Sequence, residues 1–151
     1  METSAAAIED RIGGLVESVI PGDSVYLVEV VVRGRQGSRV VEVYLDSDGG
    51  MGVDELARYS REVGFLLEAE DLVKGKYRLD VSSPGADRPL RLPRQLPKHV
   101  GRTLAVRTES GEELKGVLKE ASAGRLVLAG NGEDVALDFD RIQEAKVVLP
   151  W

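Results

Sequence analysis

The first half of the chain alternates between helical and strand patterns. Apolar residues recur at i, i+4, i+7, i+8 and i+11 within residues 4–20, which predicts an amphipathic helix. Residues 24–33 and 39–46 are rich in valine and leucine and are separated by a glycine-bearing turn, so they predict a β-hairpin. Because the apolar residues of 24–33 fall on both faces, this strand is expected at the centre of its sheet.

A second helix and a third strand complete this half. The pattern predicts a helix over residues 54–67, with Asp54 as its N-cap. A strand is predicted from Tyr77, because apolar and polar residues alternate as far as Val81. The element order predicts a small α/β layer in which two helices cover one face of a three-stranded sheet. The predicted buried stripe of the second helix comprises Leu56, Ala57, Ser60, Val63 and Leu67.

The last third of the chain consists of short strand patterns and tight turns. Glycine-bearing turns separate most of the strands, and a single helical turn is predicted at residues 140–144. This spacing is typical of a small closed or nearly closed barrel of the SH3 or Sm type. The predicted strands are residues 103–108, 114–120, 125–129, 135–138 and 145–149.

Prolines mark the junction between the two halves. Four of the six prolines lie between Pro84 and Pro97, a density that predicts a stiff, extended connector. The predicted fold class is α+β, with an N-terminal α/β domain over residues 1–90 and a C-terminal SH3/Sm-like β-barrel domain over residues 91–151. A run of basic residues with no acidic residue among them begins on the connector and comprises Arg88, Arg91, Arg94, Lys98, Arg102 and Arg107.

Charge is unevenly distributed along the chain. Residues 1–90 hold 10 Lys/Arg and 17 Asp/Glu, a net charge of −7, whereas residues 91–151 hold 10 and 9, a net charge of +1. Nonspecific affinity for nucleic acid comes from Lys and Arg that replace counterions, so an acidic domain does not supply it. We therefore expect the N-terminal half to contact a basic protein, and any contact with RNA to use the local basic run.

The composition excludes several kinds of site. The chain has no cysteine, which excludes disulfides and thiolate metal sites, and its single histidine, His99, excludes a multi-histidine metal centre. No apolar run approaches the roughly 20 residues that span a bilayer, and the N-terminal residues lack a signal-peptide pattern. We expect a cytoplasmic protein without a cofactor, a metal ion or a membrane partner.

Three local motifs suggest chemistry that their surroundings argue against. The D-x-D-G beginning at Asp46 starts like a calcium loop, but its twelfth position is Ala57 rather than glutamate. The G-x-x-G of residues 49–52 matches the phosphate-clamping loop of KH domains, but carboxylates crowd it. Ser82 and Ser83 lack the G-x-S-x-G elbow and a nearby base that a hydrolase would need. No catalytic constellation is therefore predicted.

The most specific stretch follows the third predicted strand. Pro84-Gly85 suits the central positions of a type II turn, Asp87 offers an acceptor to nearby amides, and Pro89 holds Arg88 extended. We call residues 82–90 the signature segment. Its defining residues are Ser82, Ser83, Pro84, Gly85, Asp87, Arg88, Pro89 and Leu90.

The signature segment resembles that of the RimP family of ribosome maturation factors. The motif reads Val81-Ser82-Ser83-Pro84-Gly85 followed by Asp87-Arg88-Pro89-Leu90, and the family usually has leucine where this chain has Ala86. Residues 46–52 are similar to the family's acidic, glycine-rich turn before its second helix. Residues 139–142, with Ala145, are similar to its closing segment. The resemblance thus extends over nearly the whole chain.

The resemblance implies a non-catalytic assembly factor that binds the maturing small (30S) ribosomal subunit and assists its late maturation. The implied partner is the immature or free small subunit, through its RNA and proteins, and we expect a monomer with no small-molecule substrate. Two alternatives stay open: an Sm-like RNA-binding module with an accessory domain, and a hydrolase. The candidate residues for contact with ribosomal RNA or a ribosomal protein are Arg91, Arg94, Lys98 and Arg102.

Overall fold

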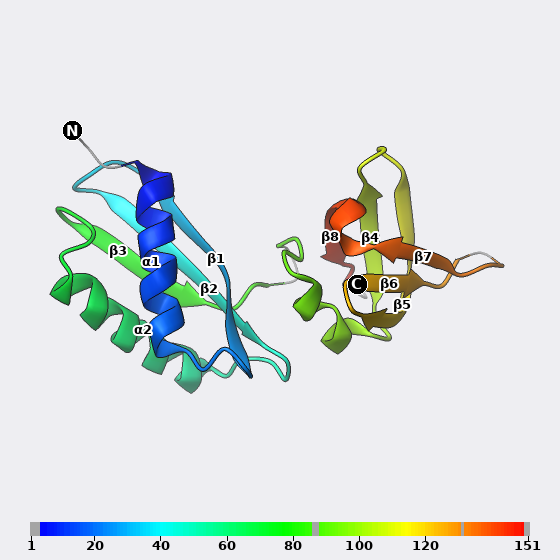
Figure 1. The fold of residues 1–151 in the computed structure, drawn as a ribbon, viewed down its shortest axis with the longest axis horizontal. Coiled ribbons are helices and arrows are strands. Elements are labelled where there is room, and N and C mark those ends of the chain that lie inside the picture. The colour runs from blue at the N-terminus through cyan, green and yellow to red at the C-terminus, as the bar shows by residue number, and fades with distance from the viewer. Residues whose placement is uncertain (1–3, 86–87, 131, 150–151) are drawn as a thin grey trace. The chain divides into compact units, whose positions relative to one another are not determined.

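The computed structural model describes residues 4–85, 88–130 and 132–149, and Figure 1 shows its α+β fold, as predicted. The chain divides into two compact units, which we call the N-terminal unit (Met1–Ser83) and the C-terminal unit (Pro84–Trp151). The predicted separation into independently folding domains of residues 1–90 and 91–151 stays a prediction. Within the described residues, no helix is long and apolar enough to cross a membrane.

The N-terminal unit has the predicted order helix–strand–strand–helix–strand. Strands β1 and β2 form the antiparallel hairpin, and β2 pairs in parallel with β3, so the sheet order is β1-β2-β3. The prediction that residues 24–33 form the central strand is therefore wrong. The hairpin fills one edge of β2, and the crossover through the second helix brings β3 to its other edge. The elements are α1 (Ala5–Val19), β1 (Val25–Arg33), β2 (Arg39–Ser47), α2 (Val53–Ala69) and β3 (Tyr77–Ser82).

Both helices cover the same face of this sheet, as Figure 1 shows. Ile12 of α1 and Val63 of α2 pack with Val41 of β2 in one buried apolar cluster. Burial of this aliphatic surface is the main stabilising term for so small a layer. A Cβ atom at the position of Gly13 in α1 would lie 3.7 Å from the Leu27 side chain of β1. A small residue therefore suits this contact between helix and strand.

Helix α2 begins earlier than predicted, and this changes its buried face. Its N-cap is Gly52, so Asp54 lies within the first turn, where its negative charge favours the positive end of the helix dipole. Val63 and Leu67 are buried as predicted, but Ala57 is exposed and Tyr59 takes the buried position. The buried stripe therefore runs through residues 59, 63 and 67, at a spacing of one turn.

The C-terminal unit is a five-stranded antiparallel sheet in the order β7-β6-β5-β4-β8. The five predicted strands are present, but the helical turn is a 3₁₀ turn, η3 (Phe139–Arg141), and the last strand begins at Ile142 rather than at residue 145. Among the described residues no ladder joins β7 to β8, so the hydrogen-bonded sheet is open and the fully closed barrel is not observed. The strands are β4 (Thr103–Thr108), β5 (Glu113–Ser122), β6 (Arg125–Leu128), β7 (Val135–Asp138) and β8 (Ile142–Val147).

Strand β5 connects the two halves of this sheet. Its first part pairs with β4, and its second part pairs with β6 after a register shift between Leu118 and Glu120. Gly116, just before this shift, lies against the carbonyl oxygen of Ala129, where a side chain would collide. The apolar core of the unit consists of Leu96, Leu104, Val106, Leu118, Leu126, Leu128, Ala145 and Val147.

The proline-rich connector differs from the prediction. Residues 93–99 are not extended but form two 3₁₀ turns, η1 (Pro93–Gln95) and η2 (Pro97–His99), each with proline at its start. The fixed φ of proline, near −65°, suits the first position of a helical turn as well as an extended chain. Leu96, between these turns, is buried in the core of the C-terminal unit. This part of the connector therefore belongs to that unit.

Candidate functional site

The signature segment begins inside the sheet of the N-terminal unit. Ser82 is the last residue of β3 and pairs with Tyr44 of β2, where the parallel ladder ends. Ser83 follows as the final residue of the unit, and both serines are half-buried. The start of the segment is thus fixed by main-chain pairing to the central strand of the sheet.

One main-chain hydrogen bond lies in the middle of the segment. The amide of Arg88 donates it to the carbonyl oxygen of Gly85, at 3.0 Å. Ala86 and Asp87 lie outside the described residues, so the predicted acceptor role of Asp87 and the type II turn at Pro84-Gly85 stay predictions. Arg88 and Pro89 are half-buried.

The end of the segment is attached to the C-terminal unit. The amide of Leu90 donates a 2.8 Å hydrogen bond to the carbonyl oxygen of Ala145 on β8. The Leu90 side chain packs against the apolar core of the same unit. The signature segment therefore begins in the hydrogen-bonded sheet of the N-terminal unit and ends with a hydrogen bond to the sheet of the C-terminal unit.

Gln95 organises the chain directly after the segment. Its side-chain oxygen accepts hydrogen bonds from the amides of Arg91, at 2.7 Å, and Leu92, at 2.9 Å. The amide of Gln95 in turn donates to the carbonyl of Leu92, so the two residues cap η1. Gln95 is only 1% exposed. Nothing local in the sequence predicts this role, because a capping box has serine or threonine three residues before the glutamine, whereas this chain has Leu92.

The predicted basic contact residues have different environments. Arg91 and Arg102 are exposed, whereas Arg94 of η1 and Lys98 of η2 are half-buried. Arg107 of β4 is not a free charge: its guanidinium lies 3.2 Å from Glu144 and donates a hydrogen bond to Gln143, at 3.0 Å. The basic run therefore does not form one uniform patch.

The N-terminal unit carries ion pairs on its sheet. Arg33 Nε lies 2.9 Å from Glu42, and this hydrogen-bonded partner raises the pKa of Arg33. The Tyr44 hydroxyl donates to the same carboxylate at 2.9 Å, and Arg78 pairs with Asp80, also at 2.9 Å. Within the described residues no group of three or more His, Cys, Asp or Glu side chains could hold a metal ion.

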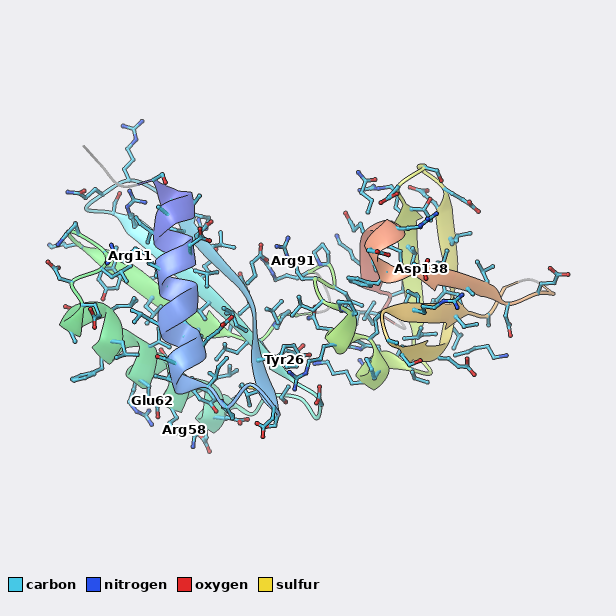
Figure 2. The ribbon with its side chains drawn as sticks, viewed as in Figure 1. Arg11, Tyr26, Arg58, Glu62, Arg91 and Asp138 are labelled. Atoms are coloured by element: carbon cyan, nitrogen blue, oxygen red, sulfur yellow. The ribbon has the colours of Figure 1, made fainter. Side chains whose placement is uncertain are left out.

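The outer surface of α2 is also charged. Figure 2 shows Arg58 and Glu62 on this helix. The Arg58 guanidinium lies 4.9 Å from the centre of the Tyr59 ring, a cation–π distance. Phe65 and Val53 of the same helix are 73% and 84% exposed, so each leaves apolar surface in contact with solvent.

Comparison with known families decides the identity of the chain. The family model of the RimP N-terminal domain matches residues 15–87. The chain belongs to the RimP family of ribosome maturation factors. The match covers most of the N-terminal unit and ends within the signature segment, so it confirms the resemblance over residues 15–87. Membership in the RimP family implies a ribosome-related partner in general terms.

Proposed function

We propose that this RimP-family protein is a non-catalytic assembly factor that binds the maturing small (30S) ribosomal subunit and assists its late maturation. The family match over residues 15–87 is the observation that carries the proposal. The signature segment, which the family resemblance singled out, adds support because both of its ends are held by main-chain hydrogen bonds. The proposed location is the cytoplasm, where small subunits mature.

The two units are proposed to contact different components of the subunit. The N-terminal unit has 9 Lys/Arg and 16 Asp/Glu over residues 1–83, a net charge of −7, which favours a basic ribosomal protein. The C-terminal unit has 11 Lys/Arg and 10 Asp/Glu over residues 84–151, a net charge of +1, and holds all the candidate contact arginines and lysine. Two linked contacts bind more tightly than either alone, because the second becomes intramolecular.

The signature segment is proposed to set the length of chain between these two contacts. Ser82 is held in the β3 ladder and Leu90 is held to β8, so only residues 83–89 join the two networks. A short join raises the effective concentration of the second contact after the first has formed. Arg88 is proposed to contact the ribosomal partner at this join.

Sedimentation through a sucrose gradient tests the proposal. Purified protein should travel with free small subunits and not with assembled ribosomes. The Arg91→Ala/Arg94→Ala/Lys98→Ala variant should bind subunits more weakly and with a shallower salt dependence, as expected for lost phosphate contacts. Arg125→Ala is the matched control, because Arg125 is exposed on β6 and pairs with Asp138 at 3.3 Å. Absence of the wild-type chain from the small-subunit fractions would contradict the proposal.

Variants of Arg88 test the proposed role of the signature segment. Arg88→Ala should weaken subunit binding. Arg88→Lys should bind like wild type if the partner is a single phosphate, but not if the partner is a carboxylate held by two parallel hydrogen bonds. Wild-type binding by both variants would show that Arg88 makes no functional contact.

The alternative function is that of an Sm-like RNA-binding module with an accessory domain. It predicts that residues 84–151 alone bind RNA and small subunits as tightly as the full chain. The proposed assembly factor predicts instead that the isolated C-terminal unit binds subunits far more weakly. The same gradient experiment with both proteins separates the two functions.

A further inference from the structure

A groove with basic walls lies on the outer face of the C-terminal sheet. It is an open cavity of about 630 Å³ formed by the start of β4, the end of β8 and Lys115 of β5. Its lining includes Arg102 and Lys115 and no carboxylate. A second cavity of about 330 Å³ shares Lys115 and extends to Lys146. Both cavities lie along β4 and have Lys115 in their lining, and we call the two together the channel.

The strand register places one lysine on each side of Ala105. Ala105 of β4 pairs with Lys115 of β5 on one side and with Lys146 of β8 on the other. Leu104 and Val106 are buried in the core, so Ala105 and its two neighbours point to the outer face. Lys115 and Lys146 therefore lie on the same face of the sheet, on either side of the small Ala105 side chain. An anion bound above Ala105 would be flanked by both ammonium groups.

The ion pairs leave the groove positively charged. Arg102 and Lys115 form no ion pair with the residues that the structure describes. Lys146 Nζ lies 3.5 Å from Glu144, but that carboxylate also pairs with Arg107. The smaller cavity is also lined by Arg107 and Glu113, so the two cavities together have four cationic and two acidic side chains and a net positive lining. By contrast Lys119, also on β5, is paired with Asp134 at 2.8 Å.

We propose that this groove binds the sugar-phosphate backbone of RNA. A channel along β4 from Thr103 to Arg107 is about 13 Å long, at roughly 3.3 Å per residue, and suits an extended polyanion. Lysine ammonium groups bind phosphate as point charges without the planar geometry that favours paired carboxylates. Val117 and Leu149 are 41% and 42% exposed at its edge and offer apolar contact to ribose or bases. Because these contacts are electrostatic and apolar, binding is independent of base sequence.

The inference rests on the proposed function, which supplies ribosomal RNA as the natural ligand. It joins Arg102, one of the predicted contact residues, to Lys115 and Lys146, which lie outside the basic run of residues 88–107.

Fluorescence anisotropy with a labelled 12-nucleotide uridine RNA tests the groove in the full-length chain. Lys115→Ala and Lys146→Ala should each weaken binding about 5- to 10-fold at 0.1 M salt and lower the salt slope by about 0.7. Lys119→Ala removes the same charge from the same strand and should bind like wild type. Lys115→Arg should restore affinity. Circular dichroism of each variant confirms that the sheet is intact.

Two results would overturn the inference. The first is that wild type does not bind the RNA, or that the groove variants bind it like Lys119→Ala. The second is that polyglutamate of similar length binds as tightly as the RNA and depends on the same lysines, which would identify an acidic protein as the ligand.

Small-subunit sedimentation separates this inference from the proposed function. If groove variants lose RNA binding but still travel with small subunits, the groove is supported and the main subunit contact lies elsewhere. If wild type binds the RNA through the groove but never travels with small subunits, the groove is again supported and the assembly-factor proposal fails.

Discussion

The amide nitrogen of Leu90 lies 2.8 Å from the carbonyl oxygen of Ala145, so the end of the signature segment is hydrogen-bonded to the last strand of the chain. The Leu90 side chain packs on the core of the C-terminal unit. A cut after residue 90 would therefore remove contacts that stabilise this unit, although the proline pattern favours a boundary there.

Fragments of the chain test this relationship. Residues 84–151 should be more stable than residues 91–151 by about 1–2 kcal/mol, because the shorter fragment loses one hydrogen bond and a half-buried leucine. Urea denaturation measures the difference. Residues 1–83 and 1–90 should differ by less than about 0.5 kcal/mol, because Leu90 makes its hydrogen bond and its apolar contacts in the C-terminal unit. Equal unfolding midpoints for the two C-terminal fragments would contradict the prediction.

Gln95→Ala should destabilise the C-terminal unit by about 1–3 kcal/mol, because the part-buried amides of Arg91 and Leu92 would lose their acceptor. Thermal or urea unfolding of the full chain measures the loss. Gln143→Ala is the matched control, since Gln143 is exposed and its hydrogen bond to Arg107 lies at the surface. It should cost no more than about 0.5 kcal/mol. A similar loss in both variants would show that the Gln95 cap contributes little.

Stability should fall at alkaline pH through Tyr77. Burial and a 2.8 Å hydrogen bond to Glu68 raise the pKa of the Tyr77 hydroxyl to about 12. The folded state therefore favours neutral tyrosine. Its contribution is complete below pH 10, the pKa in the unfolded chain, and is lost as the pH rises from 10 to 12. Because the group is partly exposed, we expect a loss of about 1 kcal/mol relative to Tyr77→Phe.

Urea unfolding of wild type and Tyr77→Phe at several pH values between 9 and 12 checks this prediction. The comparison with phenylalanine cancels the titration of lysines and arginines, which both proteins share. Parallel curves for the two proteins across this range would exclude the proposed contribution of Tyr77.

Two glycine variants should change stability in opposite directions. In Gly116→Ala the new methyl group would collide with the Ala129 carbonyl, and we expect a loss of about 1–3 kcal/mol. Gly14→Ala places a methyl group in open space on the exposed side of α1, and we expect a gain of about 0.5–1 kcal/mol. Unfolding free energies of the two variants test both signs. A neutral Gly116→Ala would mean that β5 and β6 can move apart at this point.

The sequence by itself determined the local elements, the class of fold and the family. Periodicity identifies a helix or strand because it depends only on which residues share a face, and this holds for both helices and for the hairpin. The signature segment was identified in the same way, because its turn residues restrict the backbone locally. The segregation of acidic residues into residues 1–90 is a property of composition and needs no structure.

Tertiary structure decided the features that depend on partners distant in sequence. The position of residues 25–33 at the sheet edge follows from the pairing of β2 with β3, which no local pattern records. Prolines 93 and 97 are compatible with both extended chain and 3₁₀ turns, and burial of Leu96 selects the turns. Lys115 and Lys146 face one groove only because both of their strands pair with β4 at Ala105. Nothing in the sequence near either lysine indicates the other, because strand register is set by the packing of the whole sheet.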